Sequence, residues 1–217
     1  MVNGAPCIGL RMLEELAEDT DVFLTALGWV GLAWTCAGLA YLTFGQDSPE
    51  SAILAVRHGW ELRDRRPGRG HSRTQRASAV AAPPNEPFAV TVQANAEIRR
   101  RVRGMLVDYA AGTGALDESV PLDLACRTDF QRRVMLACRR IPYGATCGYR
   151  NLAEMVGAPQ AARAVGGVMA RNPVPLFVPC HRVLAAGGHL GGFSAPQGLA
   201  MKRRLLELEA AHASQFA

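Results

Sequence analysis

The stretch that decides the organisation of this chain is NPVPLFVPCHRV, residues 172–183, where prolines frame an apolar run that ends in a Cys-His pair. A cysteine becomes a nucleophile as its thiolate, which a nearby histidine or cation favours. Neighbours along a strand point to opposite faces, so Cys180 and His181 also fit a buried cysteine beside a surface histidine. The dipeptide alone favours this structural interpretation, and the surrounding sequence has to decide.

The residues before this stretch predict two short helices, Tyr149–Val156 and Pro159–Ala170, with Pro159 at a first helical position. The second contains Gly166 and Gly167, which cost a helix about 1 kcal/mol each relative to alanine. Such a cost suggests close approach of another backbone, from protein or DNA. Helix pairs of this kind are common in α-rich domains, so the pair does not establish DNA binding.

Upstream of these helices, Thr128 is expected to cap a helix that begins at Asp129. Turn-forming residues 141–144 end it. The 3.6-residue period predicts an apolar face made of Phe130, Val134, Leu136 and Ala137.

The uncharged segment Val22–Gln46 is long enough to span a bilayer. It contains four glycines, however, and has no positive flank close to either end. We therefore predict two strands, Phe23–Thr35 and Leu39–Phe44, that turn at residues 36–38.

A helix start is predicted at residues 48–50, a helix over Ala94–Tyr109 and a short strand over Val120–Leu124. Residues 61–87 are rich in Arg, Pro, Gly, Ser and Ala and have no hydrophobic period. They predict an exposed loop or a flexible basic insertion, and a solvated segment is favoured over a DNA contact.

Charge is distributed unevenly along the 217 residues. Up to Cys126 there are 12 Arg or Lys against 15 Asp or Glu, a net charge of −3; from Arg127 onward there are 12 against 4, a net of +8, which gives the overall +5. The second part is therefore the candidate for contact with a polyanion.

The six cysteines are scattered and form no CxxC pair, which indicates neither a zinc ribbon nor a redox dithiol. Cys7, Cys36 and His58 are not convincing metal ligands, so no metal is predicted. No basic region opens the chain, and residues 14–21 are acidic, which argues against a secretory signal. Reduced thiols in a cytoplasmic protein are expected.

The surroundings of Cys180 settle the ambiguity. The block RAVGGVMARNPVPLFVPCHRV, residues 163–183, is followed by two glycine pairs and then by Phe193 and Ser194. Over Asp129–Glu209 the chain resembles the O6-alkylguanine-DNA alkyltransferase family. The resemblance implies an α+β fold, in which a small ribonuclease-H-like α/β domain (1–126) precedes a mostly helical domain (127–217) with a helix-turn-helix.

The resemblance also implies the catalytic residues. Cys180 would be the alkyl acceptor, His181 its base through a water, and Glu209 the group that orients His181. Asn172 would brace the active-site turn, and Tyr149 would rotate the phosphate and protonate the leaving guanine.

Two further sets of residues follow from it. For DNA binding, Arg163 would fill the place of the flipped base, with further contacts from the helix pair; for the pocket, Phe193 and Ser194 would contact the base. The full sets are Arg163, Tyr149, Ala162, Gly166 and Arg171 for DNA, and Phe193, Ser194, Val183, Pro175 and Met169 for the pocket. Family members often carry Tyr where Phe193 stands, and the loop 195–197 is bulkier than their frequent Gly-rich form, which puts the accepted alkyl size in doubt.

The expected function is thus DNA repair by irreversible, single-turnover transfer from O6-alkylguanine in duplex DNA, with O4-alkylthymine as a second candidate substrate. We expect a cytoplasmic monomer that binds the minor groove and needs no cofactor, membrane or obligate protein partner. The alternatives are a sensor of alkylated DNA that does not react, a cysteine hydrolase and a DNA-binding regulator. The sensors lack the acceptor cysteine, whereas Cys180 is present.

Overall fold

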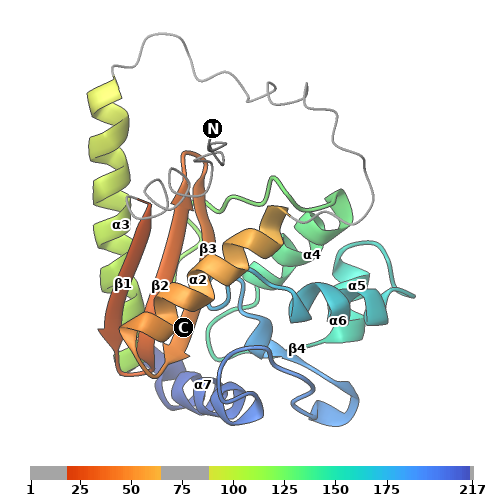
Figure 1. Ribbon diagram of the computed structural model, residues 1–217. Coiled ribbons are helices and arrows are strands. Elements are labelled where there is room, and N and C mark those ends of the chain that lie inside the picture. Colours follow the sequence, from red (N-terminus) through yellow and green to blue (C-terminus); the bar gives the residue numbers. More distant parts are fainter. Residues whose placement is uncertain (1–18, 65–87, 216–217) are drawn as a thin grey trace, which may run out of the picture.

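The computed structural model describes residues 19–64 and 88–215, which form a three-stranded antiparallel sheet surrounded by helices (Figure 1). The sheet has the order β1-β2-β3, and a two-stranded parallel pair, β4-β5, lies in the helical part. The strands are β1 (Thr20–Thr25), β2 (Gly28–Thr35), β3 (Gly38–Gln46), β4 (Cys147–Gly148) and β5 (Val183–Leu184), and the α-helices are α2 (Pro49–Asp64), α3 (Phe88–Ala111), α4 (Asp129–Arg139), α5 (Tyr149–Met155), α6 (Ala162–Ala170) and α7 (Leu199–His212). Three short 3-10 helices, η1 (Cys180–Arg182), η2 (Ala186–Gly188) and η3 (Ala213–Gln215), complete the described elements.

The predicted strand Phe23–Thr35 is wrong, because a turn divides it into β1 and β2. Thr25 stabilises this turn: its hydroxyl donates to the Gly28 carbonyl at 2.8 Å and accepts from the Leu27 amide at 3.2 Å. Gly28 has a φ of 103°, which a residue with a side chain rarely adopts. The expected turn after β2 is confirmed, and no helix among the described residues is long and apolar enough to cross a membrane.

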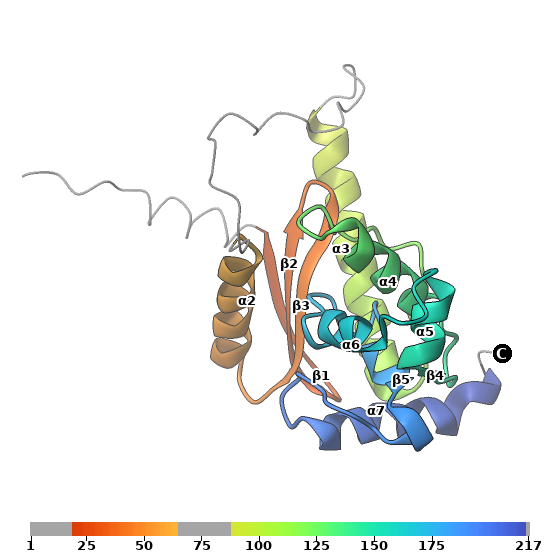
Figure 2. The same cartoon turned by 90° about the vertical axis from the view of Figure 1, so that its right-hand side faces the viewer.

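The sheet separates α2 from the rest of the molecule (Figure 2). Helix α2 packs against all three strands, and it approaches β2 closely at Gly31. The opposite face of the sheet contributes to a core shared with α3, α7 and the segment before Cys180.

Strand β3 forms the edge of the sheet nearest to the helical part, and two segments occupy its free backbone groups. The Leu42 amide donates to the Pro173 carbonyl at 2.8 Å. Leu39 pairs with residues around Leu122 in a single parallel bridge, so the strand predicted over 120–124 is not formed. Pro121 has no backbone N–H and therefore cannot extend the pairing.

In the helical part, the capped start of α4 is confirmed. Thr128 accepts from the Gln131 amide, and the Gln131 side chain accepts in return from the Thr128 amide. The predicted apolar face of α4 is wrong at one position, because Leu136 is 48% exposed. The buried face is instead Val134, Met135, Ala137 and Cys138.

Helix α6 begins at Ala162, so the expected helix start at Pro159 is also wrong. The Ala161 amide donates to the Ala158 carbonyl at 2.8 Å, which closes a turn around Pro159. Proline suits the second position of such a turn because its φ is already set.

The remaining expectations concern the long helices and the insertion between them. Helix α2 starts as predicted and continues to Asp64, so residues 61–64 are helical and not part of a loop. Helix α3 begins at Phe88, earlier than expected. The rest of the predicted insertion (65–87) and Cys7 lie outside the described residues.

Gly31→Ala should destabilise the protein by about 1–3 kcal/mol, because there is no room for a methyl group between α2 and β2. A Cβ at this position would lie 2.6 Å from the Val56 side chain and 3.1 Å from the Ala52 carbonyl oxygen. Urea denaturation measures the change. Gly104→Ala is the matched control, since a Cβ there meets nothing within 4 Å and the helix should gain roughly 0.5–1 kcal/mol. Equal effects of the two substitutions would contradict the close packing.

Candidate active site

The active-site segment 172–183 lies between two hydrophobic cores. Val174, Leu176 and Phe177 belong to the core that the sheet shares with α3 and α7. Val178, Cys180 and Val183 belong to the core formed with α4, α5 and α6. The cysteine is therefore positioned by both halves of the molecule.

Asn172 holds the bend that leads to Cys180. Its amide nitrogen donates to the Val178 carbonyl at 2.7 Å, and its amide oxygen accepts from the Val174 amide at 3.1 Å. Leu176 within this bend has a φ of 72°, which is strained for a residue with a bulky side chain. Because the surrounding core and the Asn172 bonds fix this conformation, the backbone entering Cys180 has little freedom.

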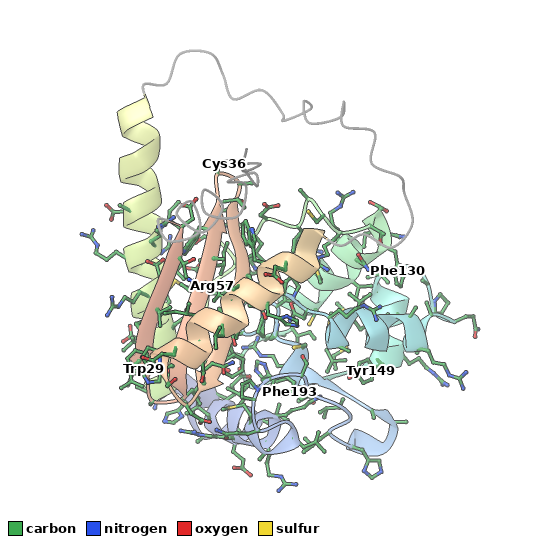
Figure 3. All side chains as sticks on the ribbon, viewed as in Figure 1. Trp29, Cys36, Arg57, Phe130, Tyr149 and Phe193 are labelled. Carbon is green, nitrogen blue, oxygen red and sulfur yellow. The ribbon has the colours of Figure 1, made fainter. Side chains whose placement is uncertain are left out.

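Cys180 is the first residue of η1 and is 5% exposed. It lies in the wall of a cavity of about 410 Å³ between α6 and the loop that follows β5. Figure 3 shows Tyr149 and Phe193 in this region, far from Cys36 at the tip of the β2-β3 hairpin. The cavity is lined by Tyr149, Gly166, Met169, Ala170, Cys180, Gly192, Phe193 and Ser194.

Behind Cys180, the carboxylate of Glu209 on α7 is buried and accepts five hydrogen bonds. Oε1 accepts from the Tyr109 hydroxyl at 2.6 Å, His181 Nε2 at 2.8 Å and Arg182 Nη2 at 2.9 Å. Oε2 accepts from Arg182 Nε at 2.8 Å and the Gly144 amide at 3.1 Å. The network joins α3, the turn after α4, η1 and α7.

The charges in this network follow from burial and pairing. Burial on its own would raise the pKa of Glu209, but the hydrogen bonds from His181 and Arg182 and the positive charge of Arg182 outweigh it and hold the pKa well below its usual range. Burial lowers the pKa of His181, with Glu209 opposing the shift. We therefore assign an ionised Glu209 paired with Arg182 and a neutral His181 that carries its proton on Nε2. Nδ1 of His181 is buried and makes no hydrogen bond within the described part of the chain, so its lone pair can accept a proton.

The thiol of Cys180 is uncharged at rest. Burial raises its pKa, while the nearby Asn172 amide and Lys202 ammonium act in the opposite direction. Lys202 is fully buried, and its Nζ donates to the Val183 carbonyl at 2.6 Å. The cavity thus has a neutral thiol on its wall, with a base and a cation behind it.

The structure brings together some of the predicted site residues and separates others. Tyr149, Gly166, Met169, Phe193 and Ser194 line the same cavity as Cys180.

Arg163 and Arg171 are exposed, at the beginning and just after the end of α6, and Ala162 is the first residue of that helix. Val183 is fully buried, outside the cavity lining. Pro175 lines a neighbouring cavity on the other side of residues 193–194.

Sequence reasoning missed two members of the buried network, Tyr109 and Arg182, and also the buried Lys202. The positions of Lys202 and Glu209 do carry a sequence signal: the two residues are seven positions apart on α7 and share its buried face with Met201 and Leu205. Charged residues at such positions indicate buried polar partners. Tyr109 gives no such signal in the sequence.

Comparisons with known proteins identify the family of the chain. Residues 129–211 match the family described as 6-O-methylguanine DNA methyltransferase, DNA binding domain. The methylated-DNA–protein-cysteine methyltransferase of Mycobacterium leprae is 40% identical over 164 residues, which cover 75% of this chain and 88% of that protein. The corresponding protein of Mycobacterium bovis is 50% identical over 118 residues, 49% of this chain and 70% of that protein.

Among solved structures, the crystal structure of Mycobacterium tuberculosis OGT in complex with DNA aligns over 89% of this chain and 93% of that chain, with a TM-score of 0.57 and 31% identity. The matches define a class of DNA-binding transferases that act through a cysteine. The chain belongs to the family of methylated-DNA–protein-cysteine methyltransferases.

Glu209→Gln should lower the free energy of unfolding at pH 7 by about 3–5 kcal/mol, because it leaves the buried Arg182 without its counter-charge. The pKa of Glu209 is depressed in the folded state, so its contribution is present above the unfolded pKa of about 4.3 and is lost as the pH falls further. The difference between wild type and variant should therefore narrow below that pH.

Urea denaturation at pH 7 and at several acidic pH values measures this difference. Glu207→Gln on the exposed side of the same helix is the control and should have little effect at any pH. A stability difference for Glu209→Gln that does not depend on pH would contradict the ionised pairing.

Proposed function

We propose that this protein repairs duplex DNA by moving an alkyl group from O6 of a damaged guanine to Sγ of Cys180, irreversibly and once per molecule. The observation that carries the proposal is the position of Cys180, which lines a cavity large enough for a base while its neighbour His181 contacts buried Glu209. A thioether has no good leaving group for hydrolysis, so the reacted protein is not regenerated. No cofactor is required.

In the proposed reaction, His181 Nδ1 takes the thiol proton through a water, and Glu209 stabilises the imidazolium. The sulfur lone pair forms the bond to the alkyl carbon, and the carbon–O6 bond breaks with its electrons going to guanine. Burial raises the pKa of Tyr149, so this phenol keeps its proton until a basic guanine anion develops beside it. Tyr149 then donates its proton to the guanine, and the imidazolium loses its proton to solvent as the phenolate regains one, so that overall one proton moves from the thiol to the leaving guanine.

DNA would bind through α5 and α6, acting as a helix-turn-helix in the minor groove. The base must leave the stack to reach Cys180, which costs a few kcal/mol. Arg163 is exposed at the start of α6 and would fill the vacated place, while Ala162, Gly166 and Arg171 would contact the backbone. The net charge of +8 from Arg127 onward supports phosphate contacts that do not depend on sequence.

Within the cavity, Phe193 would stack on the flipped base and Ser194 would contact O6. Met169 would form part of the wall. Val183 would contribute its backbone and Pro175 would contact larger alkyl groups from the neighbouring cavity. O4-alkylthymine, with an alkylated oxygen of similar position, is a second candidate substrate.

The same proposal extends to the rest of the molecule. The antiparallel sheet with α2 and α3 is compatible with a small ribonuclease-H-like domain that ends near residue 126. We expect a cytoplasmic monomer whose partner is alkylated double-stranded DNA.

Incubation with a duplex containing one O6-methylguanine should add about one methyl mass per protein molecule, because the transfer is covalent and stoichiometric. Intact-protein mass spectrometry measures the gain, which Cys180→Ala should abolish. Cys147→Ala is the matched control, since it removes a nearby half-buried thiol and should leave the gain unchanged. Tight binding of the duplex without any mass change would instead identify a damage sensor.

Arg163→Ala should slow methyl transfer from the duplex by about 10- to 100-fold, because loss of the group that replaces the flipped base removes a few kcal/mol of stabilisation. Transfer from free O6-methylguanine needs no flipping and should change little. Arg100→Ala, an exposed arginine on α3, is the control. An equal loss with both substrates would assign Arg163 to the chemistry or the fold and not to flipping.

A further inference from the structure

Tyr109 connects the first part of the chain to the proposed catalytic residues. It lies on α3, which packs on the sheet through residues such as Val102 and Leu106. Its side chain is fully buried, and its hydroxyl donates to Glu209 Oε1 at 2.6 Å. The hydroxyl oxygen of Tyr109 also lies 3.3 Å from His181 Nε2. The Tyr109 hydroxyl thus contacts both His181, which lies 72 positions further along the chain, and Glu209, which lies 100 positions further.

We propose that Tyr109 is a positioning residue for alkyl transfer: its hydroxyl fixes Glu209 Oε1 in line with His181 Nε2 and so keeps the basic lone pair on Nδ1. This inference rests on the proposed roles of Cys180, His181 and Glu209. A neutral histidine has one N–H and one lone pair, so the hydrogen bond at Nε2 determines which nitrogen can take the thiol proton.

Arg182 and His181 both bind the Glu209 carboxylate, which explains why a further donor such as the Tyr109 hydroxyl is needed. Arg182 binds both oxygens of Glu209, and its charge also opposes protonation of His181. Without Tyr109, Oε2 would still be held by Arg182 Nε and the Gly144 amide, but Oε1 would be fixed outside the imidazole only by Arg182 Nη2. Tyr109 holds Oε1 from another direction and brings no positive charge toward the future imidazolium.

A phenol suits this position because it stays a donor. Burial, together with the negative charge of Glu209, raises the pKa of Tyr109 well above its usual value. The titratable and charged groups around the His-Glu pair are Cys180 and Arg182 on η1, Tyr143 in the turn after α4, Lys202 on α7 and Tyr109 itself. Of these, Tyr109 is the neutral side chain whose hydroxyl donates to Oε1, the same carboxylate oxygen that His181 binds.

The experiment is the pH dependence of single-turnover methyl transfer from an O6-methylguanine duplex, for wild type, Tyr109→Phe and Tyr41→Phe. Without the hydroxyl, the weaker His-Glu bond makes His181 a poorer base. Because a poorer base has a lower pKa, the acidic limb of the profile should then move to lower pH by about one unit, with a roughly threefold slower reaction on the plateau and convergence toward wild type on the acidic limb. Tyr41 is a half-buried tyrosine on β3, and Tyr41→Phe should keep the wild-type profile.

Tyr109→Phe removes one oxygen and keeps the ring that packs edge-on against Tyr143, with centroids 6.0 Å apart. An unchanged rate, or a uniform loss at every pH, would overturn the proposal and leave Tyr109 a packing residue. If the variant does not fold, ¹⁵N NMR of the histidine rings in the wild-type protein still tests it. A neutral His181 with its proton on Nδ1 at pH 7 would be incompatible with the inferred role.

The two proposals fail in different ways. If wild type gains no methyl mass, the function proposed for Cys180 is wrong, whatever the role of Tyr109. If wild type gains the mass and Tyr109→Phe has the wild-type pH profile, only the positioning role is wrong.

Discussion

The rest of the structure depends on one buried carboxylate. Glu209 is 1% exposed and accepts hydrogen bonds from Tyr109, Gly144, His181 and Arg182. A buried charge is tolerated only where it is paired and hydrogen-bonded, so each of these donors also stabilises the packing around it. Since the donors come from α3, the turn after α4 and η1, the carboxylate fixes how these segments meet α7. The contacts that satisfy the buried charge are therefore the same ones that hold the residues proposed for catalysis.

The sheet contributes to the site through its edge. An exposed edge strand has unpaired amides and carbonyls, and here the β3 edge binds Pro173 and the segment around Leu122. Pro173 follows Asn172, whose side chain ties the bend that leads into Cys180. The sheet in the first half of the chain thus supports the segment 172–183, and Cys180 at the end of this segment packs against the helices of the second half.

The features that could be predicted from the sequence are those set by neighbouring residues and those set by the continuous motif around Cys180. The Thr128 cap, the turn after β2 and the helix pair α5-α6 depend on neighbouring residues, and they were predicted except for the start of α6. The turn within the first predicted strand was missed because Ala26 and Leu27 are ordinary strand residues, and only the Thr25 hydroxyl and Gly28 mark it.

The buried network could not be predicted for a different reason. A tyrosine in a helix with apolar neighbours predicts core packing, and nothing local distinguishes Tyr109 from any other core aromatic. Its partner lies 100 residues away, so the hydrogen bond exists only once α3 and α7 are packed. Networks of this kind depend on tertiary contacts, whereas Cys180 was visible because its motif is continuous in sequence.

The resting charges suit a nucleophile that is used once. Burial raises the pKa of the Cys180 thiol and lowers that of His181, so the pair is neutral at rest. A permanent thiolate would react with oxidants and stray electrophiles, and each such event would consume the protein. The Lys202 charge and the ionised Glu209 are instead buried behind the thiol, where they would stabilise the thiolate and the imidazolium of the proposed reaction. Because these groups are already in place, little reorganisation would accompany the proposed transfer.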